Sequence, residues 1–85
     1  MIRIYADFNN LDEAERVVLS CMGSLKDIDR CKEKLATGMK VILYMPNEFE
    51  VTATLDFDGV WNGIPDWDTI HYLNQGSEDT DSVAD

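Results

Sequence analysis

The side chains with the most obvious chemistry in this sequence lie in its last third. His71 is the only histidine, and the carboxylates of Asp66 and Asp68 precede it closely. Nucleophilic catalysis would require a serine or cysteine beside the histidine and a third group to orient the ring, and no pattern in the sequence provides that arrangement. We therefore interpret His71 as a surface residue of a strand, with pH sensing through the two carboxylates as an alternative.

Metal sites receive as little support as catalytic ones. Asp56, Asp58 and Gly59 imitate the beginning of a calcium-binding loop, but a ligand before the glycine and the closing glutamate are missing. Cys21 and Cys31 have no second pair of ligands nearby, so they do not match a zinc site. We predict no catalytic, cofactor-binding or metal-binding residues, and we interpret both cysteines as small buried apolar residues.

A group of aromatic and acidic residues is better suited to binding a protein. Aromatic rings attract the cationic side chains of Arg and Lys, carboxylates pair with them, and aromatic residues are enriched at protein interfaces. Trp61 and Trp67 also admit another interpretation, because a tryptophan on a strand can face the core. The predicted interaction surface comprises Glu48, Glu50, Asp56, Asp58, Trp61, Asp66, Trp67, Asp68 and Tyr72.

The charge distribution indicates the sign of such a partner. The 85-residue chain has 17 acidic and 7 basic residues and a formal net charge of −10. Residues 1–40 contain all seven basic residues and seven acids, whereas residues 41–85 contain ten acids and no Lys or Arg. This composition disfavours direct binding to nucleic acid or to a membrane surface, both of which require basic residues. It favours a basic protein partner, with solubility alone as the alternative explanation.

Strands position most of these residues, and one helix lies between them. The alternation of apolar and polar residues in segment 1–8 predicts a half-buried strand. Segment 11–22 fits either a helical stripe or a strand, and its paired β-branched residues favour a strand at 15–21. A helix is predicted over 24–36, because Ser24 offers a cap and apolar residues recur after it at helical spacing.

The clearest pattern covers residues 39–64, which we predict to form an antiparallel meander of three strands. Residues 48–58 alternate between apolar and polar types without interruption, and an Asp-Gly pair at their end is a strong hairpin signal. Residues 65–68 are predicted to form a tight turn or one turn of 3₁₀ helix. Residues 69–73 follow as a final short strand.

Together these elements predict a mainly β fold, α+β by element count. We expect a small five-stranded antiparallel barrel, partly open and SH3-like, with the helix over one end or an open edge. Residues 1–73 are predicted to form this single domain. Residues 74–85 carry four acids and no aromatic residue, and they are predicted to be a disordered acidic tail.

Several motifs resemble those of a group of short bacterial proteins. They are the YADFNN start at 5–10, the GSLKDI segment at 23–28, the GMKVILY strand at 38–44 and the W-x₃-PDWD finish at 61–68. The resemblance spans most of residues 1–70. It implies a strand at 15–21 and a bacterial, cytosolic setting, and it carries over no activity.

We therefore predict a small non-enzymatic, cytoplasmic interaction module that binds a basic protein surface through its acidic strand and the region of Trp67. One alternative is a nucleic-acid mimic that occupies a basic protein, because same-face acids on a strand are about 6.8 Å apart, close to the spacing of phosphates. A second alternative is a weak divalent-cation binder or small enzyme that uses His71, Asp66 and Asp68. A homodimer is a further option for the assembly.

Overall fold

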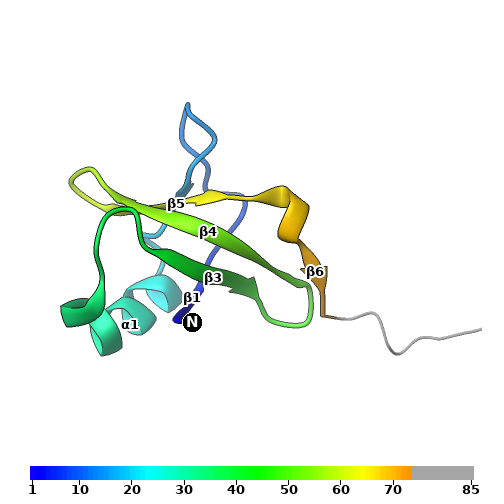
Figure 1. Ribbon diagram of the computed structural model, residues 1–85, viewed down its shortest axis with the longest axis horizontal. Coiled ribbons are helices and arrows are strands. Elements are labelled where there is room, and N and C mark those ends of the chain that lie inside the picture. The colour runs from blue at the N-terminus through cyan, green and yellow to red at the C-terminus, as the bar shows by residue number, and fades with distance from the viewer. Residues whose placement is uncertain (74–85) are drawn as a thin grey trace, which may run out of the picture.

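The computed structural model describes residues 1–73, which form a curled, half-open barrel with one α-helix in this range (Figure 1). The elements are β1 (Arg3–Tyr5), β2 (Val17–Val18), α1 (Met22–Cys31), the 3₁₀ turn η1 (Lys32–Lys34), β3 (Lys40–Met45), β4 (Phe49–Phe57), β5 (Trp61–Pro65), the 3₁₀ turn η2 (Trp67–Thr69) and β6 (His71–Tyr72). The sheet order is β1-β3-β4-β5-β2, and β6 pairs with the beginning of β4. The predicted fold class, mainly β in a partly open barrel with a short helix, is confirmed.

One strand pairing differs from the expected antiparallel arrangement. β3, β4 and β5 form the predicted antiparallel meander. β1 instead runs parallel to β3, with Ile4 opposite Leu43. The chain segment that contains β2 and α1 separates these two strands, and a crossover of this length allows the chain to return and pair in the same direction.

The core lies between the inner face of the curled sheet and α1. The alternation in β4 is confirmed there, because Val51, Ala53 and Leu55 are buried while Phe57, at the end of the strand, is half exposed. The helix contributes Ile28 to the same cluster. The buried apolar residues are Ile4, Ala6, Val17, Leu19, Ile28, Val41, Leu43, Val51, Ala53 and Leu55.

The helix begins earlier and ends sooner than the predicted range 24–36. Cys21 precedes its first residue, and Ser24 is fully buried within the first turn instead of capping it. The hydroxyl of Ser24 donates to the backbone carbonyl of Tyr5. The spacing of Ser24 and Asp27 imitates a capping box, but both side chains serve a tertiary contact. The predicted cap was therefore wrong.

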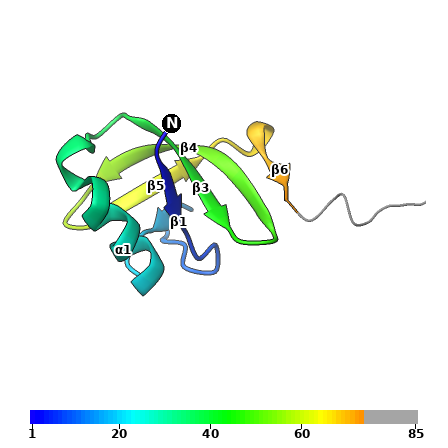
Figure 2. The same ribbon diagram turned by 90° about the horizontal axis from the view of Figure 1, so that it is seen from below.

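This contact covers the free edge of β1 (Figure 2). Because Ala6 donates its N–H to β3, the N–H and C=O of Tyr5 point to the opposite side, toward α1. Asp27 accepts the N–H of Tyr5 at 2.9 Å, and Ser24 donates to its C=O. Gly23 allows the close approach, since a Cβ there would lie 2.6 Å from a carbon of the Tyr5 ring. Two helix side chains thus bond the edge groups that would otherwise be open to pairing.

The ambiguous segment 11–22 contains a strand, as favoured, but the strand is only two residues long. β2 pairs with β5, and the N–H of Leu19 continues the contact by donating to Trp61. Asn10 covers the outer edge of β2, because its carbonyl accepts the N–H of Val18 and its side-chain amide donates to the Val18 carbonyl. The chain between Asn10 and Val18 doubles back as a narrow loop that projects from the sheet (Figure 1).

The chain after β5 is shifted relative to the predicted turn at 65–68 and strand at 69–73. The 3₁₀ turn covers Trp67–Thr69, and it interrupts the partners of β4. The N–H of Asp66 donates to Thr52, and the N–H of Thr52 donates to the hydroxyl of Thr69. The hydroxyl of Thr69 therefore takes the place of the backbone carbonyl that a paired strand would offer to Thr52. Pairing with β4 then resumes at β6. The predicted disordered tail at 74–85 lies outside the described residues.

Candidate interaction surface

The structure separates the predicted interaction residues into two groups at opposite ends of β4. Tyr72 pairs with the first residue of this strand, and Trp67 precedes it on η2. Trp61 lies at the other end, where its ring centroid is 5.0 Å from that of Phe57. Trp61 is half-buried and packs against the core, as the core interpretation expected. The nine predicted residues therefore do not form one continuous surface.

Four aromatic residues meet at the beginning of β4, and we call them the aromatic end: Phe8, Phe49, Trp67 and Tyr72. Phe8 and Phe49 pack against the core, with ring centroids 4.8 Å apart. Trp67 contacts Phe8 at 5.7 Å between centroids, and Tyr72 meets Phe49 at 6.2 Å. Trp67 is 48% exposed and Tyr72 is 51% exposed. The inner rings thus form a base on which two outer side chains remain half in water.

Carboxylates border the aromatic end. Glu48 precedes β4, Asp66 and Asp68 flank Trp67 in the chain, and all three are exposed. Within residues 1–73 none of these three carboxylates takes part in an ion pair. Asp66 accepts the N–H of Asp68, which fixes the 3₁₀ turn that presents Trp67. Exposed rings and unneutralised negative charge therefore occur together here.

Glu50 is different, because Arg3 neutralises it. The guanidinium of Arg3 lies 4.9 Å from the centroid of the Tyr44 ring and donates to the Glu50 carboxylate. This hydrogen bond holds the pKa of Glu50 below its ordinary value of 4.5. Nδ1 of His71 lies 3.8 Å from the other Glu50 oxygen, so the histidine faces this glutamate and not the two aspartates considered from the sequence.

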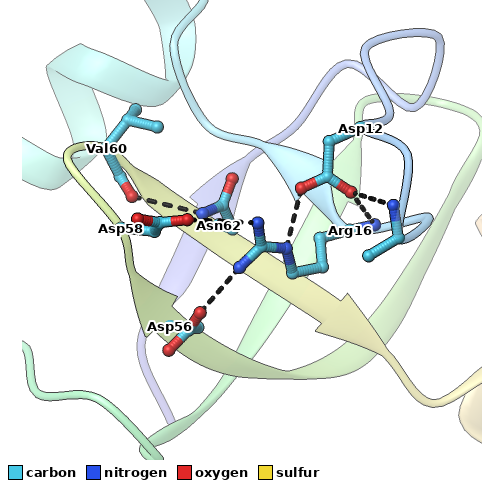
Figure 3. Close-up of polar contacts among 7 residues, drawn as sticks. Asp12, Arg16, Asp56, Asp58, Val60 and Asn62 are labelled. Atoms are coloured by element: carbon cyan, nitrogen blue, oxygen red, sulfur yellow. Dashed lines mark hydrogen bonds and ion pairs between the residues drawn. The ribbon is translucent and has the colours of Figure 1, made fainter.

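Arg16 binds the acids at the opposite end of the acidic strand (Figure 3). Its guanidinium lies 2.7 Å from a carboxylate oxygen of Asp12 and 2.7 Å from one of Asp56. A third carboxylate, that of Asp58, is 3.5 Å away. Asn62, which is only 2% exposed, pairs with Asp56 on the neighbouring strand and donates its side-chain amide to the carbonyl of Val60. In this Arg16 cluster one cation faces three acids, so Asp56 and Asp58 are already engaged within the chain.

Arg16 lies on the loop before β2, and hydrogen bonds to Asp12 stabilise the conformation of this loop. The Asp12 carboxylate accepts the backbone N–H groups of Ala14 and Arg16, each at 2.9 Å. Its backbone carbonyl accepts the N–H of Glu15, which has a φ of 63°, a conformation uncommon for residues other than glycine. The N–H of Arg16, together with its guanidinium, lowers the pKa of Asp12 below its ordinary value of 3.8.

Four residues that define these sites are missing from the predicted surface. Phe8 and Phe49 both pack against the core as their strand patterns predicted, but the strand predicted over 1–8 covers only Arg3–Tyr5, so that Phe8 lies in a turn beyond it. The alternation does not show that the two rings meet Trp67. Arg3 and Arg16 reach acids 47 and 40 residues away in the chain, and no local pattern reveals such distant partners. The usable signal was the position of Arg3 on the polar face of an alternating strand, but it does not identify Glu50, because β3 lies between β1 and β4.

The cysteines and acids form no reactive or metal-binding cluster in the described part of the chain. In residues 1–73 no group of three His, Cys, Asp or Glu side chains is placed to hold a metal ion. Cys21 and Cys31 are free, and both are half-buried where full burial was expected. Burial raises the pKa of the Cys31 thiol, and the charge of Asp27 adds to this effect. Cys31 therefore carries little of the thiolate that reactivity requires.

The Arg3–Glu50 pair predicts a loss of stability in acid. Because the folded-state pKa of Glu50 is depressed, its contribution is present above the ordinary value of 4.5 and is lost as the pH falls through the lower folded value. We expect Glu50→Gln to lower Tm at pH 7 by a few °C. Its Tm should then decline less steeply than that of the wild type between about pH 5 and about pH 3. Thermal unfolding followed by circular dichroism measures both effects.

Glu48→Gln is the matched control for this measurement. Glu48 is exposed and makes no ion pair among the described residues. This variant should keep the Tm and the acid profile of the wild type. Identical profiles for Glu50→Gln and the wild type would show that the ion pair contributes nothing to stability.

The described residues define a small β-rich domain with an open half-barrel, a helix-covered edge and an aromatic end bordered by acids. Comparison with known protein families, with curated proteins and with solved structures returns no match for this chain. Within residues 1–73, no helix has both the length and the apolar character needed to cross a membrane. The function must therefore be argued from the aromatic end and from the placement of charge.

Proposed function

We propose that this protein is a non-enzymatic interaction module whose aromatic end binds a basic segment of a protein partner. The observation that carries the proposal is that Trp67 and Tyr72 are half exposed while they pack on the rings of Phe8 and Phe49, which in turn pack against the core. Rigid aromatic side chains offer a large contact area at low cost in conformational entropy, which explains their enrichment at interfaces. The bordering carboxylates select for Arg and Lys on the partner.

The chain itself contains an example of the contact that we expect with the partner. Arg3 lies over the Tyr44 ring and donates to the carboxylate of Glu50. An arginine of the partner, placed over Trp67 or Tyr72, would make the same two kinds of contact with a ring and a neighbouring acid. Cation–π contact and charge pairing act on the same group in this arrangement.

The proposal narrows the predicted surface to five of its nine residues. Glu50 and Asp56 have arginine partners within the chain, and Asp58 lies close to one of them. Trp61 packs against the core at the far end of β4. The residues that remain are Glu48, Asp66, Trp67, Asp68 and Tyr72.

Nucleic-acid mimicry is the less favoured alternative. It requires rows of unneutralised acids at phosphate spacing on one face. The two rows on β4 and its flanks are Glu48 with Glu50, and Asp56 with Asp58. Each row contains a residue bound by an arginine of this chain, which weakens its likeness to a phosphate backbone.

We also propose a cytoplasmic location in a bacterium and an SH3-like character for the barrel. The motif resemblance at 5–10 and at 61–68 supports the bacterial setting. The open barrel of short strands, with its antiparallel meander β3-β4-β5, supports the comparison with SH3-like folds. Many unrelated functions occur on such folds, so the binding proposal depends on the aromatic end alone.

Site-specific photo-crosslinking in cells that naturally produce the protein tests the binding proposal. A photoreactive phenylalanine derivative replaces Tyr72 in one variant and Ile64 in the control variant. Ile64 is 46% exposed but lies on β5, away from the aromatic end. We expect the variant at position 72 to be crosslinked to a partner segment rich in Arg or Lys, and the control to lack this product. Adding Trp67→Ala should abolish the crosslink, because it removes the central ring.

Three results would contradict the proposal. They are the same products from both positions, a crosslinked segment that is neutral or acidic, and a crosslink that survives Trp67→Ala. A product that joins two copies of this chain would replace the proposed partner with a homodimer.

A further inference from the structure

We propose that the partner's basic segment binds in an extended conformation as an additional strand along the outer edge of β6. This inference rests on the proposed function and specifies how the partner is held. The aromatic end supplies side-chain contacts, and the backbone of Tyr72 supplies hydrogen bonds. Strand addition at a sheet edge is a general mode of peptide recognition, in which the main chain provides affinity and the side chains provide specificity.

The register of β6 leaves the backbone of Tyr72 facing outward. β6 lies antiparallel to β4, with His71 opposite Glu50 and Tyr72 opposite Phe49. Leu73 donates its N–H to the carbonyl of Glu48, so His71 and Leu73 are the residues bonded to β4. Because bonded and non-bonded residues alternate in an antiparallel pair, the N–H and C=O of Tyr72 point away from β4. Within residues 1–73, the N–H and the C=O of Tyr72 form no backbone hydrogen bond.

Other edges of the sheet are covered in ways that β6 is not. Asp27 and Ser24 bond both backbone groups of Tyr5 on β1. Asn10 does the same for Val18 on β2. At the end of β5 the outward position is occupied by Pro65, which has no N–H to offer. One outward position on each of these three edges is thus taken by side chains or by a proline, whereas the outward groups of Tyr72 stay open.

Charge selects the occupant of this edge. The backbone carbonyl of Glu48 accepts the N–H of Leu73, and Asp66 and Asp68 belong to the 3₁₀ turn that precedes β6. All three carboxylates are exposed, so an incoming strand that carries Arg or Lys is attracted. The chain's own residues 74–85 carry four acids and no basic residue, and they would be repelled from the same position. In an added strand, every second side chain faces the side of Tyr72 and the aromatic rings, and the others face the side of His71. An arginine at every second position therefore matches the aromatic end.

The test uses a synthetic peptide of sequence Arg-Val-Arg-Val-Arg-Val with blocked ends, titrated into the full-length protein and followed by NMR chemical shifts. The matched variants are Tyr72→Ala, which removes the ring and keeps the N–H, and Tyr72→Pro, which removes both. Proline at this position leaves the bonds of His71 and Leu73 to β4 in place. We expect Tyr72→Pro to bind the peptide about fivefold more weakly than Tyr72→Ala, the effect of one lost hydrogen bond. Thermal unfolding of both variants checks that they are folded.

A second measurement keeps the protein unchanged and alters the peptide. One peptide is N-methylated at all its valines and another at all its arginines. Because only every second backbone group of an added strand faces β6, one of these peptides should bind like the parent and the other should lose most of its affinity. The amide hydrogen of Tyr72 should also exchange more slowly when the parent peptide is bound.

The outcomes separate this inference from the proposed function. Equal affinity of Tyr72→Pro and Tyr72→Ala, with equal tolerance of both methylation patterns, would overturn strand addition. If Trp67→Ala still abolished binding in that case, the proposed interaction function would stand without it. Failure of the parent peptide to bind the wild type would also overturn strand addition, whereas the interaction function would still be judged by the crosslinked segment.

Discussion

Replacing Asp27 with alanine is expected to destabilise the protein by about 3 kcal/mol, since hydrogen bonds to a charged group contribute about 1.5–3 kcal/mol each. Oδ2 of Asp27 accepts the N–H of Tyr5 and the hydroxyl of Tyr44, both at 2.9 Å, while Oδ1 accepts from Arg30 at 3.0 Å. The side chain of Asp27 is only 12% exposed, so water replaces these bonds poorly once the carboxylate is removed. The Arg30 contact is exposed and contributes little to this sum.

Urea unfolding measures the change as a lower midpoint with an unchanged slope. Asp29→Ala on the same helix is the matched control, because Asp29 is exposed and, among residues 1–73, forms an ion pair only with the exposed Lys32. Its effect should stay below about 0.5 kcal/mol. A second readout is Tyr44, whose pKa is raised above 10 by burial and then by its bond to Asp27. That pKa should move back toward its ordinary value in Asp27→Ala. Equal destabilisation by the two substitutions would show that α1 is not fastened to β1 through Asp27.

Leu43→Ala is expected to cost about 3–4 kcal/mol, within the range found for leucine truncations in cores. Leu43 lies in the middle of β3 and is completely buried. A Cβ at position 63 would lie 2.6 Å from a terminal methyl carbon of Leu43, so this side chain fills the space that Gly63 leaves open on β5. Truncation therefore creates a cavity between β3 and β5 in addition to removing apolar contacts.

Gly63→Ala tests the same fit from the other strand. Alone, the added methyl group must displace the Leu43 side chain, at a cost of about 1–2 kcal/mol. In the Leu43→Ala background the methyl enters vacated space, so the double variant should be at least as stable as Leu43→Ala alone. Urea unfolding of the wild type, the two single variants and the double variant gives the coupling energy. Costs that simply add would show that Leu43 does not occupy the space over Gly63.

The parts of the fold that the sequence predicted best are those with short-range patterns. The meander at 39–64 has uninterrupted alternation and turn signals, and both depend on neighbouring residues. The parallel partner of β1 could not be predicted in this way. Ile4 pairs with Leu43, and its apolar pattern would be the same in an antiparallel pair. The direction of pairing depends on the crossover between β1 and β3 and not on the residues of β1.

The predicted boundaries of the helix were wrong for a related reason, because they too depend on a contact that is distant in sequence. Ser24 and Asp27 have the types and spacing of a local cap, but the unbonded backbone of Tyr5 competes for both side chains. Hydrogen bonds to the C=O and N–H of Tyr5 at the sheet edge thus outweighed the local preference of Ser24 and Asp27 for capping the helix. The signal that favours Met22 as the start of the helix is weak, because Cys21 makes no side-chain capping bond.

The candidate site could be predicted only in part. Trp67, Tyr72 and their acidic neighbours were identified from residue types, and in the structure both rings meet Phe49 at the beginning of β4. Grouping Trp61 with them was wrong, because β5 runs extended away from Trp61, which pairs with the last residue of β4, before the chain reaches Trp67. Glu50 and Asp56 were expected to be available, but arginines from distant segments bind them. Compensation of charge across a sheet depends on topology, which composition does not contain.

The length of β4 determines how the net charge of −10 acts on a partner. Its nine residues, Phe49–Phe57, separate the aromatic end from the Arg16 cluster by about 27 Å at a rise of about 3.4 Å per residue. The Debye length at physiological ionic strength is about 8 Å, so the two ends are electrostatically almost independent. A ligand at β6 therefore experiences a local potential from Glu48, Asp66 and Asp68. For the attraction of a charged partner, the molecule therefore acts as two separate acidic regions at the two ends of β4, and not as one uniformly acidic particle.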